Sequence, residues 1–182
     1  DRIVPPTELD RAAAAALPLD LQEFMGELGL TELDEPKDRA FYDRLMFHPT
    51  LTINGLNGGY GGKGSKSVLP CEAVVKCDIR LVDAMTPDDV LDKVEAHVAR
   101  HAPDVKFIRR GGMLPSRTPM DSEFTAPIKA AVAMAHGVEP LLYPSLAASL
   151  PDYVFTKTLG IPAFVVPYAN ADEANHAPNE NL

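Results

Sequence analysis

The most constraining feature of this chain is a segment, residues 71–82, in which apolar and polar side chains alternate. The odd positions are all apolar: Cys71, Ala73, Val75, Cys77, Ile79 and Leu81. Four of the even positions are charged: Glu72, Lys76, Asp78 and Arg80. A period of two predicts a β-strand with one face in the core and the other in solvent. The fold around this strand is therefore expected to cover one side of a sheet.

The neighbouring segments predict a small α+β unit. Apolar residues within 51–56 indicate a first strand, and residues 105–108 indicate a further one. Between them, Thr86 is suited to cap a helix over residues 87–102. The order of strand, strand, helix and strand is typical of helices packed on one face of an antiparallel sheet.

The first 49 residues have a different character. Five prolines interrupt them, and the helix-forming stretches between these prolines predict short helices over residues 8–17, 20–28 and 38–46. A mostly helical stretch without strands is typical of an insertion or connector. We therefore treat residues 1–49 as a helical lead-in and residues 50–116 as the α+β unit.

The last block, residues 117–182, alternates helices with strands. The expected elements are helices over 123–136 and 151–159 and strands over 141–143 and 161–167. This alternation is that of an α/β sheet with parallel strands. So small a sheet leaves its faces uncovered, which predicts that the block is part of a larger domain.

Charge and composition exclude several classes of partner. The net charge of −9 opposes binding to nucleic acid, and no apolar run approaches the roughly 20 residues of a membrane helix. Cys71 and Cys77 lie about 20 Å apart in an extended segment, too far for a disulfide. Free thiols, expected to be buried, suit a reducing compartment, and no signal peptide is visible, so we expect a cytoplasmic protein.

Two motifs point to chemistry that the context does not support. Residues 59–64 match G-x-G-x-x-G, but no helix follows to receive a dinucleotide, so a flexible hairpin loop is favoured over a nucleotide site. His97 and His101 have the i, i+4 spacing of metal ligands on a helix. With no third ligand nearby, a stabilising role at the helix C-terminus is favoured for them.

Three other residues are candidates because of their position. His176 lies in a loop beyond a hydrophobic segment, where α/β folds place their chemistry, although a plain surface histidine is the alternative. Ser149 precedes an expected helix and could bind a carboxylate, or only cap that helix. Arg80 could bind a carboxylate through two hydrogen bonds, or form an ion pair with Asp78 or Glu72.

Five segments together resemble one family of zinc metallopeptidases, that of acetylornithine deacetylase, succinyl-diaminopimelate desuccinylase, aminoacylase and the carnosinase-like dipeptidases. The segments are PTLTING at 49–55, GGYGGKGSKSVLP at 58–70, KCDIRLV at 76–82, SLP at 149–151 and HAPNE at 176–180. Their order and spacing cover residues 49–182, and the carnosinase-like branch is the most similar.

The resemblance implies a fold and a set of site residues. The fold is an α/β one: a partial ferredoxin-like α+β lid over residues 50–116, which mediates dimerisation, followed over residues 117–182 by the C-terminal part of a catalytic α/β domain. That domain holds two zinc ions in the family, for which manganese or cobalt could substitute. His176 matches a zinc ligand, and Asn179 and Glu180 match residues that support the ligands. Arg80, Ser149 and Ser67 match substrate-binding residues; some members supply the residue at the position of Ser67 across a dimer interface.

The resemblance also implies a function and its limits. The intact protein would hydrolyse the amide bond of dipeptides or N-acyl-amino acids, with zinc activating a water molecule. A catalytic zinc needs about three protein ligands, and this chain offers one matching position, so the chain alone is expected to be inactive. Ala147 and Ala148 replace the glycine pair of the family, which predicts either weaker substrate binding or a reshaped substrate loop. A non-catalytic dimerisation module is the alternative.

Overall fold

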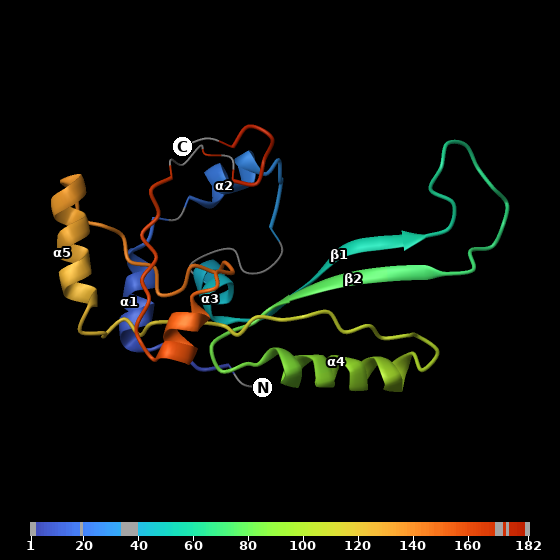
Figure 1. The fold of residues 1–182 in the computed structure, drawn as a ribbon. Helices are drawn as coiled ribbons and strands as arrows, with labels where there is room; N and C mark the ends of the chain where they lie inside the picture. The colour runs from blue at the N-terminus through green and yellow to red at the C-terminus, as the bar shows by residue number, and fades with distance from the viewer. Residues whose placement is uncertain (1–2, 19, 34–39, 170–172, 174, 181–182) are drawn as a thin grey trace.

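The computed structural model describes residues 3–18, 20–33, 40–169, 173 and 175–180. In chain order its helices and strands are α1 (Glu8–Ala16), α2 (Leu21–Glu27), α3 (Ala40–Phe47), β1 (Thr50–Gly58), β2 (Ala73–Arg80), α4 (Pro87–His101), α5 (Thr125–His136) and the π-helix η1 (Val154–Leu159). One β-hairpin projects to one side of the molecule, with α4 below it and the other labelled helices toward its base (Figure 1). All six predicted helices are present, with small shifts at their ends; the predicted start of the third lies outside the described residues.

The lead-in packs against itself through its first and third helices. Thr7 caps α1, and the side chain of Asp10 accepts a hydrogen bond from the backbone N–H of Thr7, which completes a capping box. Leu17 at the end of α1 is buried with Met46 and Phe47 from the end of α3. This small apolar cluster fixes the helices at the point where the chain enters β1.

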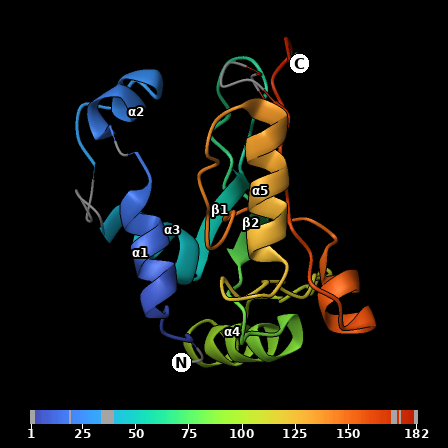
Figure 2. The same cartoon turned by 90° about the vertical axis from the view of Figure 1, so that its left-hand side faces the viewer.

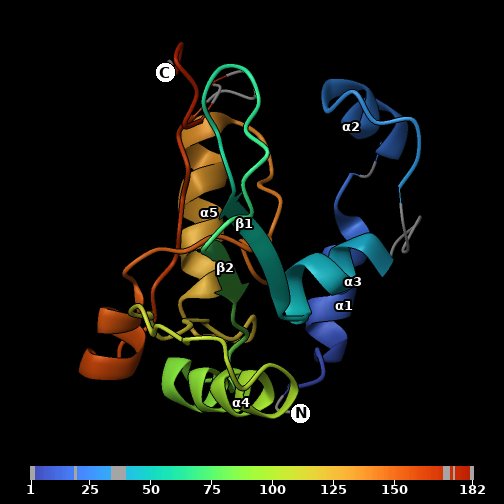
Figure 3. The same cartoon turned by 90° about the vertical axis from the view of Figure 1, so that its right-hand side faces the viewer.

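The two strands form an antiparallel pair. Thr50 lies opposite Arg80 and Gly58 opposite Ala73, with a bulge between Ile53 and Gly55. The glycine-rich stretch joins the strands at the tip of the hairpin and leads into β2, with no helix after it, so the expected hairpin is confirmed. Figures 2 and 3 show α4 beneath this hairpin, and Figure 1 shows α5 at the opposite end of the molecule from its tip.

Three predicted strands are wrong: residues 105–108, 141–143 and 161–167 form no strand. A strand exists only when its backbone pairs with a neighbour, and apolar periodicity does not supply that neighbour. Residues 161–167 show what replaces the pairing. The Thr118 hydroxyl donates to the carbonyl oxygen of Ala163 at 2.7 Å and accepts from the Ala163 N–H at 3.0 Å. A side chain therefore holds this segment where a strand was expected.

The predicted burial of one strand face is also wrong in this chain. Val75 on β2 is 53% exposed, and both Cys71 and Cys77 are exposed free thiols. Among the described residues, no element packs closely enough on this face to bury it. The apolar positions of β2 instead line a wide, open cavity between the hairpin and α4.

No helix within the described ranges is both long and apolar enough to cross a membrane.

Candidate carboxylate-binding site

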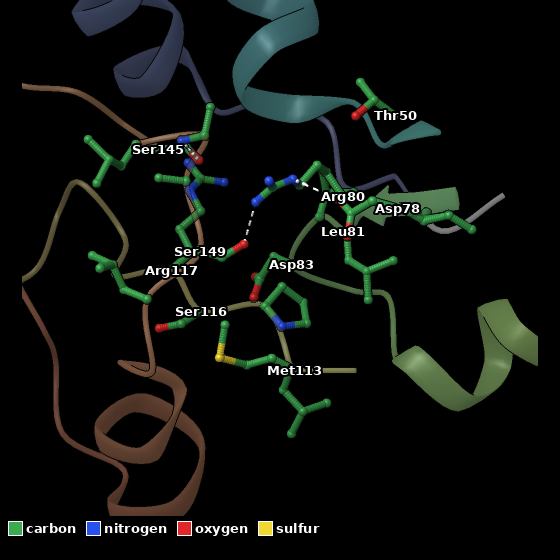
Figure 4. Close-up of a pocket in the computed structure, with 18 of the residues that line it drawn as sticks. Thr50, Asp78, Arg80, Leu81, Asp83, Met113, Ser116, Arg117, Ser145 and Ser149 are labelled. Atoms are coloured by element: carbon green, nitrogen blue, oxygen red, sulfur yellow. Dashed lines mark hydrogen bonds and ion pairs between the residues drawn. The ribbon is translucent and has the colours of Figure 1, made fainter. Parts of the chain in front are cut away.

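Arg80 and Ser149 meet at the end of the hairpin opposite its glycine-rich tip. The Arg80 Nη1 group donates a hydrogen bond to Ser149 Oγ at 2.7 Å, across 69 residues of sequence. The guanidinium also forms an ion pair through Nε with Asp78 Oδ2 at 3.0 Å. Figure 4 shows Arg80 between these two partners. The structure thus brings together two of the three predicted substrate-binding residues, and it also contains the alternative contact with Asp78.

The strand explains why Arg80 is available. Asp78 and Arg80 are two residues apart on β2, so their side chains leave the same face. Both remain about half exposed, with 50% and 55% of their side chains accessible. A half-exposed guanidinium next to a hydroxyl can bind a carboxylate through two parallel hydrogen bonds.

Ser149 belongs to a loop, residues 145–150, that we call the substrate loop. Ala147 in this loop adopts a φ of +55°, the left-handed conformation that normally favours glycine. This is one of two positions where the resemblance expects glycine and the sequence has alanine. The loop therefore retains a glycine-like backbone at Ala147 and carries some strain there.

His176 shares this unusual backbone conformation. Its φ is +63°, and Ala147 and His176 are the two non-glycine residues with positive φ in the described part of the chain. Strained residues of this kind cluster at functional sites. The His176 N–H donates to Glu180 Oε2 at 3.2 Å, so two of the residues named in the predicted metal-binding segment are in contact.

The structure does not bring His176 to Arg80 or Ser149. His176 is exposed, and the C-terminal segment rises to the top of Figures 1 to 3, above the level of β2. No group of three potential metal ligands exists among the described residues. His97 and His101 stack with their ring centroids 4.4 Å apart and also lack a third ligand there.

Ser67 lies in the glycine-rich connection at the tip of the hairpin, before β2 begins at Ala73. Arg80 lies at the other end of β2, a strand of eight residues whose extended backbone is about 23 Å long. Ser67 is exposed and cannot reach the Arg80 and Ser149 pair of its own chain.

A second arginine supports the substrate loop from the other side. Arg117 pairs with Asp10 of α1, lies 5.3 Å from the centroid of the Phe47 ring, and its Nε donates to the carbonyl oxygen of Pro144 at 3.4 Å. Pro144 is buried and directly precedes the substrate loop. Figure 4 shows the Arg117 side chain directed toward Ser145. Arg117 thereby links the lead-in helices to the loop that carries Ser149.

The environment of Asp10 shifts its acidity. Burial alone raises the pKa of this carboxyl group, but hydrogen bonds from Arg117 and Thr7, together with the charge of Arg117, outweigh burial and hold the pKa below its ordinary value. Asp10 is therefore a charged anchor at neutral pH. Its sequence signal is the capping box that begins at Thr7, but nothing in the sequence identified its partner.

A further ion pair joins the end of β2 to the last block. Lys157 Nζ of η1 lies 2.9 Å from Asp83 Oδ1, three residues after Arg80. The hydroxyls of Ser116 and Thr156 also share a hydrogen bond of 2.7 Å. These contacts hold η1 and the segment before Arg117 beside the Arg80 and Ser149 pair. Sequence reasoning did not find them, because each joins exposed or half-exposed polar residues far apart in the chain.

Comparison with known proteins identifies the family. The family model of the peptidase dimerisation domain of M20 peptidases matches residues 12–106, more than half of the chain. The human Beta-Ala-His dipeptidase is 25% identical over all of this chain and 37% of its own length. The Cys-Gly metallodipeptidase DUG1 of Saccharomyces cerevisiae is 26% identical over all of this chain and 39% of its own length.

A solved structure agrees with these relatives. The M20 family metallo-carboxypeptidase of Sulfolobus solfataricus superimposes with a TM-score of 0.80 at 28% identity, over 87% of this chain and 36% of that one. The chain thus spans less than two fifths of each of these proteins and matches their C-terminal part. The fold and the family expected from the resemblance are confirmed: the chain belongs to the M20 metallopeptidases and contains their dimerisation domain.

Proposed function

We propose that the protein to which this chain belongs is a metal-dependent hydrolase of the amide bond in dipeptides or N-acyl-amino acids. One observation carries the proposal: the 2.7 Å hydrogen bond between Arg80 and Ser149 joins the lid to the substrate loop at the place where a substrate carboxylate would bind. The relatives named above include two dipeptidases and a carboxypeptidase, whose substrates have a free carboxylate.

Arg80 and Ser149 would contribute different groups to carboxylate binding. The Arg80 guanidinium supplies the positive charge and more than one N–H donor, and Ser149 supplies a hydroxyl. Because Ser149 Oγ accepts from Arg80, its own hydrogen is free to point at a carboxylate oxygen. Leu81 and Met113 line the same cavity, so the site combines a polar end with apolar walls, as small-molecule sites generally do.

His176 would serve as one ligand of a metal ion. Imidazole nitrogen is a preferred ligand of zinc, and Asn179 and Glu180 follow in the same loop to support it. One imidazole does not complete a site, so the other ligands would come from residues outside those described here. Zinc, or manganese or cobalt in its place, would lower the pKa of a bound water molecule, and a site of two such ions is the family arrangement implied by the resemblance.

The hairpin would also mediate a homodimer. The match to a dimerisation domain supports this, and Leu51, Ile53 and Leu56 on β1 are all more than half exposed. In such a dimer, Ser67 at the hairpin tip could reach the substrate bound by the partner copy. The exposed free thiols of Cys71 and Cys77 are compatible with a reducing compartment, and we place the protein in the cytoplasm.

The decisive experiment compares metal-depleted and metal-restored protein made from the complete reading frame. We expect hydrolysis of unmodified dipeptides to disappear after chelation and to return with zinc, manganese or cobalt. A dipeptide with an amidated C-terminus should be a much poorer substrate. Hydrolysis that survives chelation, or that ignores the terminal carboxylate, would overturn the proposal.

The second candidate is a non-catalytic dimerisation module, which the match over residues 12–106 favours as a reading of the lid alone. Sedimentation of the 182-residue chain measures dimerisation separately from hydrolysis. A dimer of this chain that neither binds zinc nor changes when His176 is replaced would support the module. Dipeptide hydrolysis by the complete protein would show that the module serves an enzyme.

A further inference from the structure

Asp78 and Ser149 contact different nitrogens of the Arg80 guanidinium. Arginine has five N–H donors, one on Nε and two on each Nη nitrogen. Asp78 Oδ2 lies 3.0 Å from Nε, and Ser149 Oγ accepts from Nη1 at 2.7 Å. The two contacts lie on different sides of the same planar group, as Figure 4 shows.

A carboxylate can bind a guanidinium through two parallel hydrogen bonds at either of two edges. One edge uses Nε together with one Nη nitrogen, and the other uses the two Nη nitrogens. Asp78 Oδ2 forms an ion pair with Nε at 3.0 Å, and its negative charge disfavours a second carboxylate at the first edge. The terminal edge therefore remains for a substrate. Ser149 lies beside it, and because Nη1 carries two N–H donors, one can bind Ser149 and the other a carboxylate.

We propose that Asp78 is a positioning residue for substrate binding: it holds Nε of Arg80 so that the two Nη nitrogens, next to Ser149, receive the carboxylate of the substrate. This inference rests on the function proposed above. It adds a residue whose side chain pairs with Arg80 and would act on the substrate through that arginine.

The exposure of the pair argues against a structural role. Asp78 and Arg80 are 50% and 55% exposed, and ion pairs this accessible contribute little to folding stability. The removal of Asp78 should therefore leave the protein folded. An effect of Asp78 on binding would then reflect the orientation of Arg80.

The sign of the effect separates positioning from simple electrostatics. If Asp78 acted only by its negative charge, its removal would strengthen the attraction of Arg80 for an anionic substrate. If Asp78 positions Arg80, its removal releases a long side chain that must be ordered again for each binding event. Since charge effects between exposed groups are screened by solvent and salt, we expect the positioning effect to be the larger.

The test uses the complete protein with a dipeptide and with the same dipeptide amidated at its C-terminus. For the Asp78→Ala variant we expect KM for the free dipeptide to rise about tenfold, with kcat changed less than about twofold, and KM for the amide to stay constant. Asp78→Asn should give an intermediate KM, because its amide oxygen can accept a hydrogen bond from Arg80 but carries no negative charge. Thermal unfolding should be unchanged in both variants.

The matched control is Asp92→Asn. Asp92 lies on α4, is also exposed, and forms an ion pair with Arg109 in which Oδ1 of Asp92 lies 2.7 Å from Nη2 of Arg109. We expect this variant to match the wild type in KM and kcat. A lowered or unchanged KM for Asp78→Ala, in an active wild-type protein, would overturn the role of Asp78 and leave the proposed function intact. A wild-type protein without metal-dependent hydrolysis would overturn both.

Discussion

Asp10 of α1 and Arg117 form an ion pair that is largely removed from solvent, with 1% and 17% of their side chains exposed. Both carboxylate oxygens are used, because Oδ1 meets Arg117 and Oδ2 accepts from the backbone N–H and hydroxyl of Thr7. Arg117 in turn holds Pro144 at the start of the substrate loop. One buried carboxylate therefore connects the lead-in helices to the loop that carries Ser149.

Replacement of Asp10 by asparagine should destabilise the chain by about 3 kcal/mol, because Arg117 would be left charged, largely buried and without its partner. Equilibrium unfolding in urea measures this loss. The control is Asp104→Asn at an exposed position, for which we expect a change within about 0.5 kcal/mol. A loss for Asp10→Asn no larger than the control would contradict the importance of the pair.

The same residue predicts how stability depends on pH. An aspartate in the unfolded chain has a pKa of about 3.9, and in the folded chain the hydrogen bonds to Asp10 hold its pKa lower. The contribution of Asp10 is therefore fully present above the unfolded-state pKa and is lost as pH falls through the folded-state pKa. Urea unfolding from pH 7 downward should show a steeper loss below about pH 4 in the wild type than in Asp10→Asn. Parallel curves would contradict this prediction.

Local signals in the sequence were sufficient for the helices and the hairpin. The cap at Thr86 and the alternation along β2 each depend on neighbours in the chain, and both elements are present. The three missing strands depend on partners far away. Residues 105–108 have the composition of a strand, but their backbone pairs with no other strand among the described residues. Periodicity predicts which face is apolar and not whether another layer covers it.

The site shows the same division. Arg80 and Ser149 were identified by matching motifs, and they are in contact. Asp10, Arg117 and Lys157 were not identified, since a charged residue is ordinarily solvated and the sequence does not show which ones pair across the fold. The role of His176 stays a prediction, because the neighbours that would test it are not among the described residues.

The backbone of Ala147 gives a prediction with a matched control in the next residue. Ala147→Gly should stabilise the chain by up to about 1 kcal/mol, because glycine adopts the φ of +55° without steric cost. Ala148 does not have a positive φ, so Ala148→Gly should instead destabilise by about 0.5 to 1 kcal/mol through the greater freedom of the unfolded chain. Thermal unfolding of both variants tests whether one substitution stabilises the chain and the other destabilises it. Destabilisation by Ala147→Gly as large as that by Ala148→Gly would show that Ala147 carries no strain.

The contact between Arg80 and Ser149 makes a prediction about catalysis by the complete protein. Ser149→Ala should raise KM for a free dipeptide about tenfold, and Arg80→Met should raise it by about a hundredfold, because the guanidinium is a charged donor to the carboxylate and the serine hydroxyl is a neutral one. In both variants kcat should change much less than KM. Steady-state kinetics with the amidated dipeptide should show little effect of either substitution.

The double variant provides the sharper test. If Arg80 Nη1 and Ser149 Oγ bind the same carboxylate while in contact with each other, the loss of one partner already weakens the interaction of the other. The double variant should then raise KM by clearly less than the product of the two single effects. Effects that multiply fully would mean that the two residues act on separate parts of the substrate. The hydrogen bond between them would then be a structural contact between the lid and the loop, and carboxylate binding would have to be assigned elsewhere.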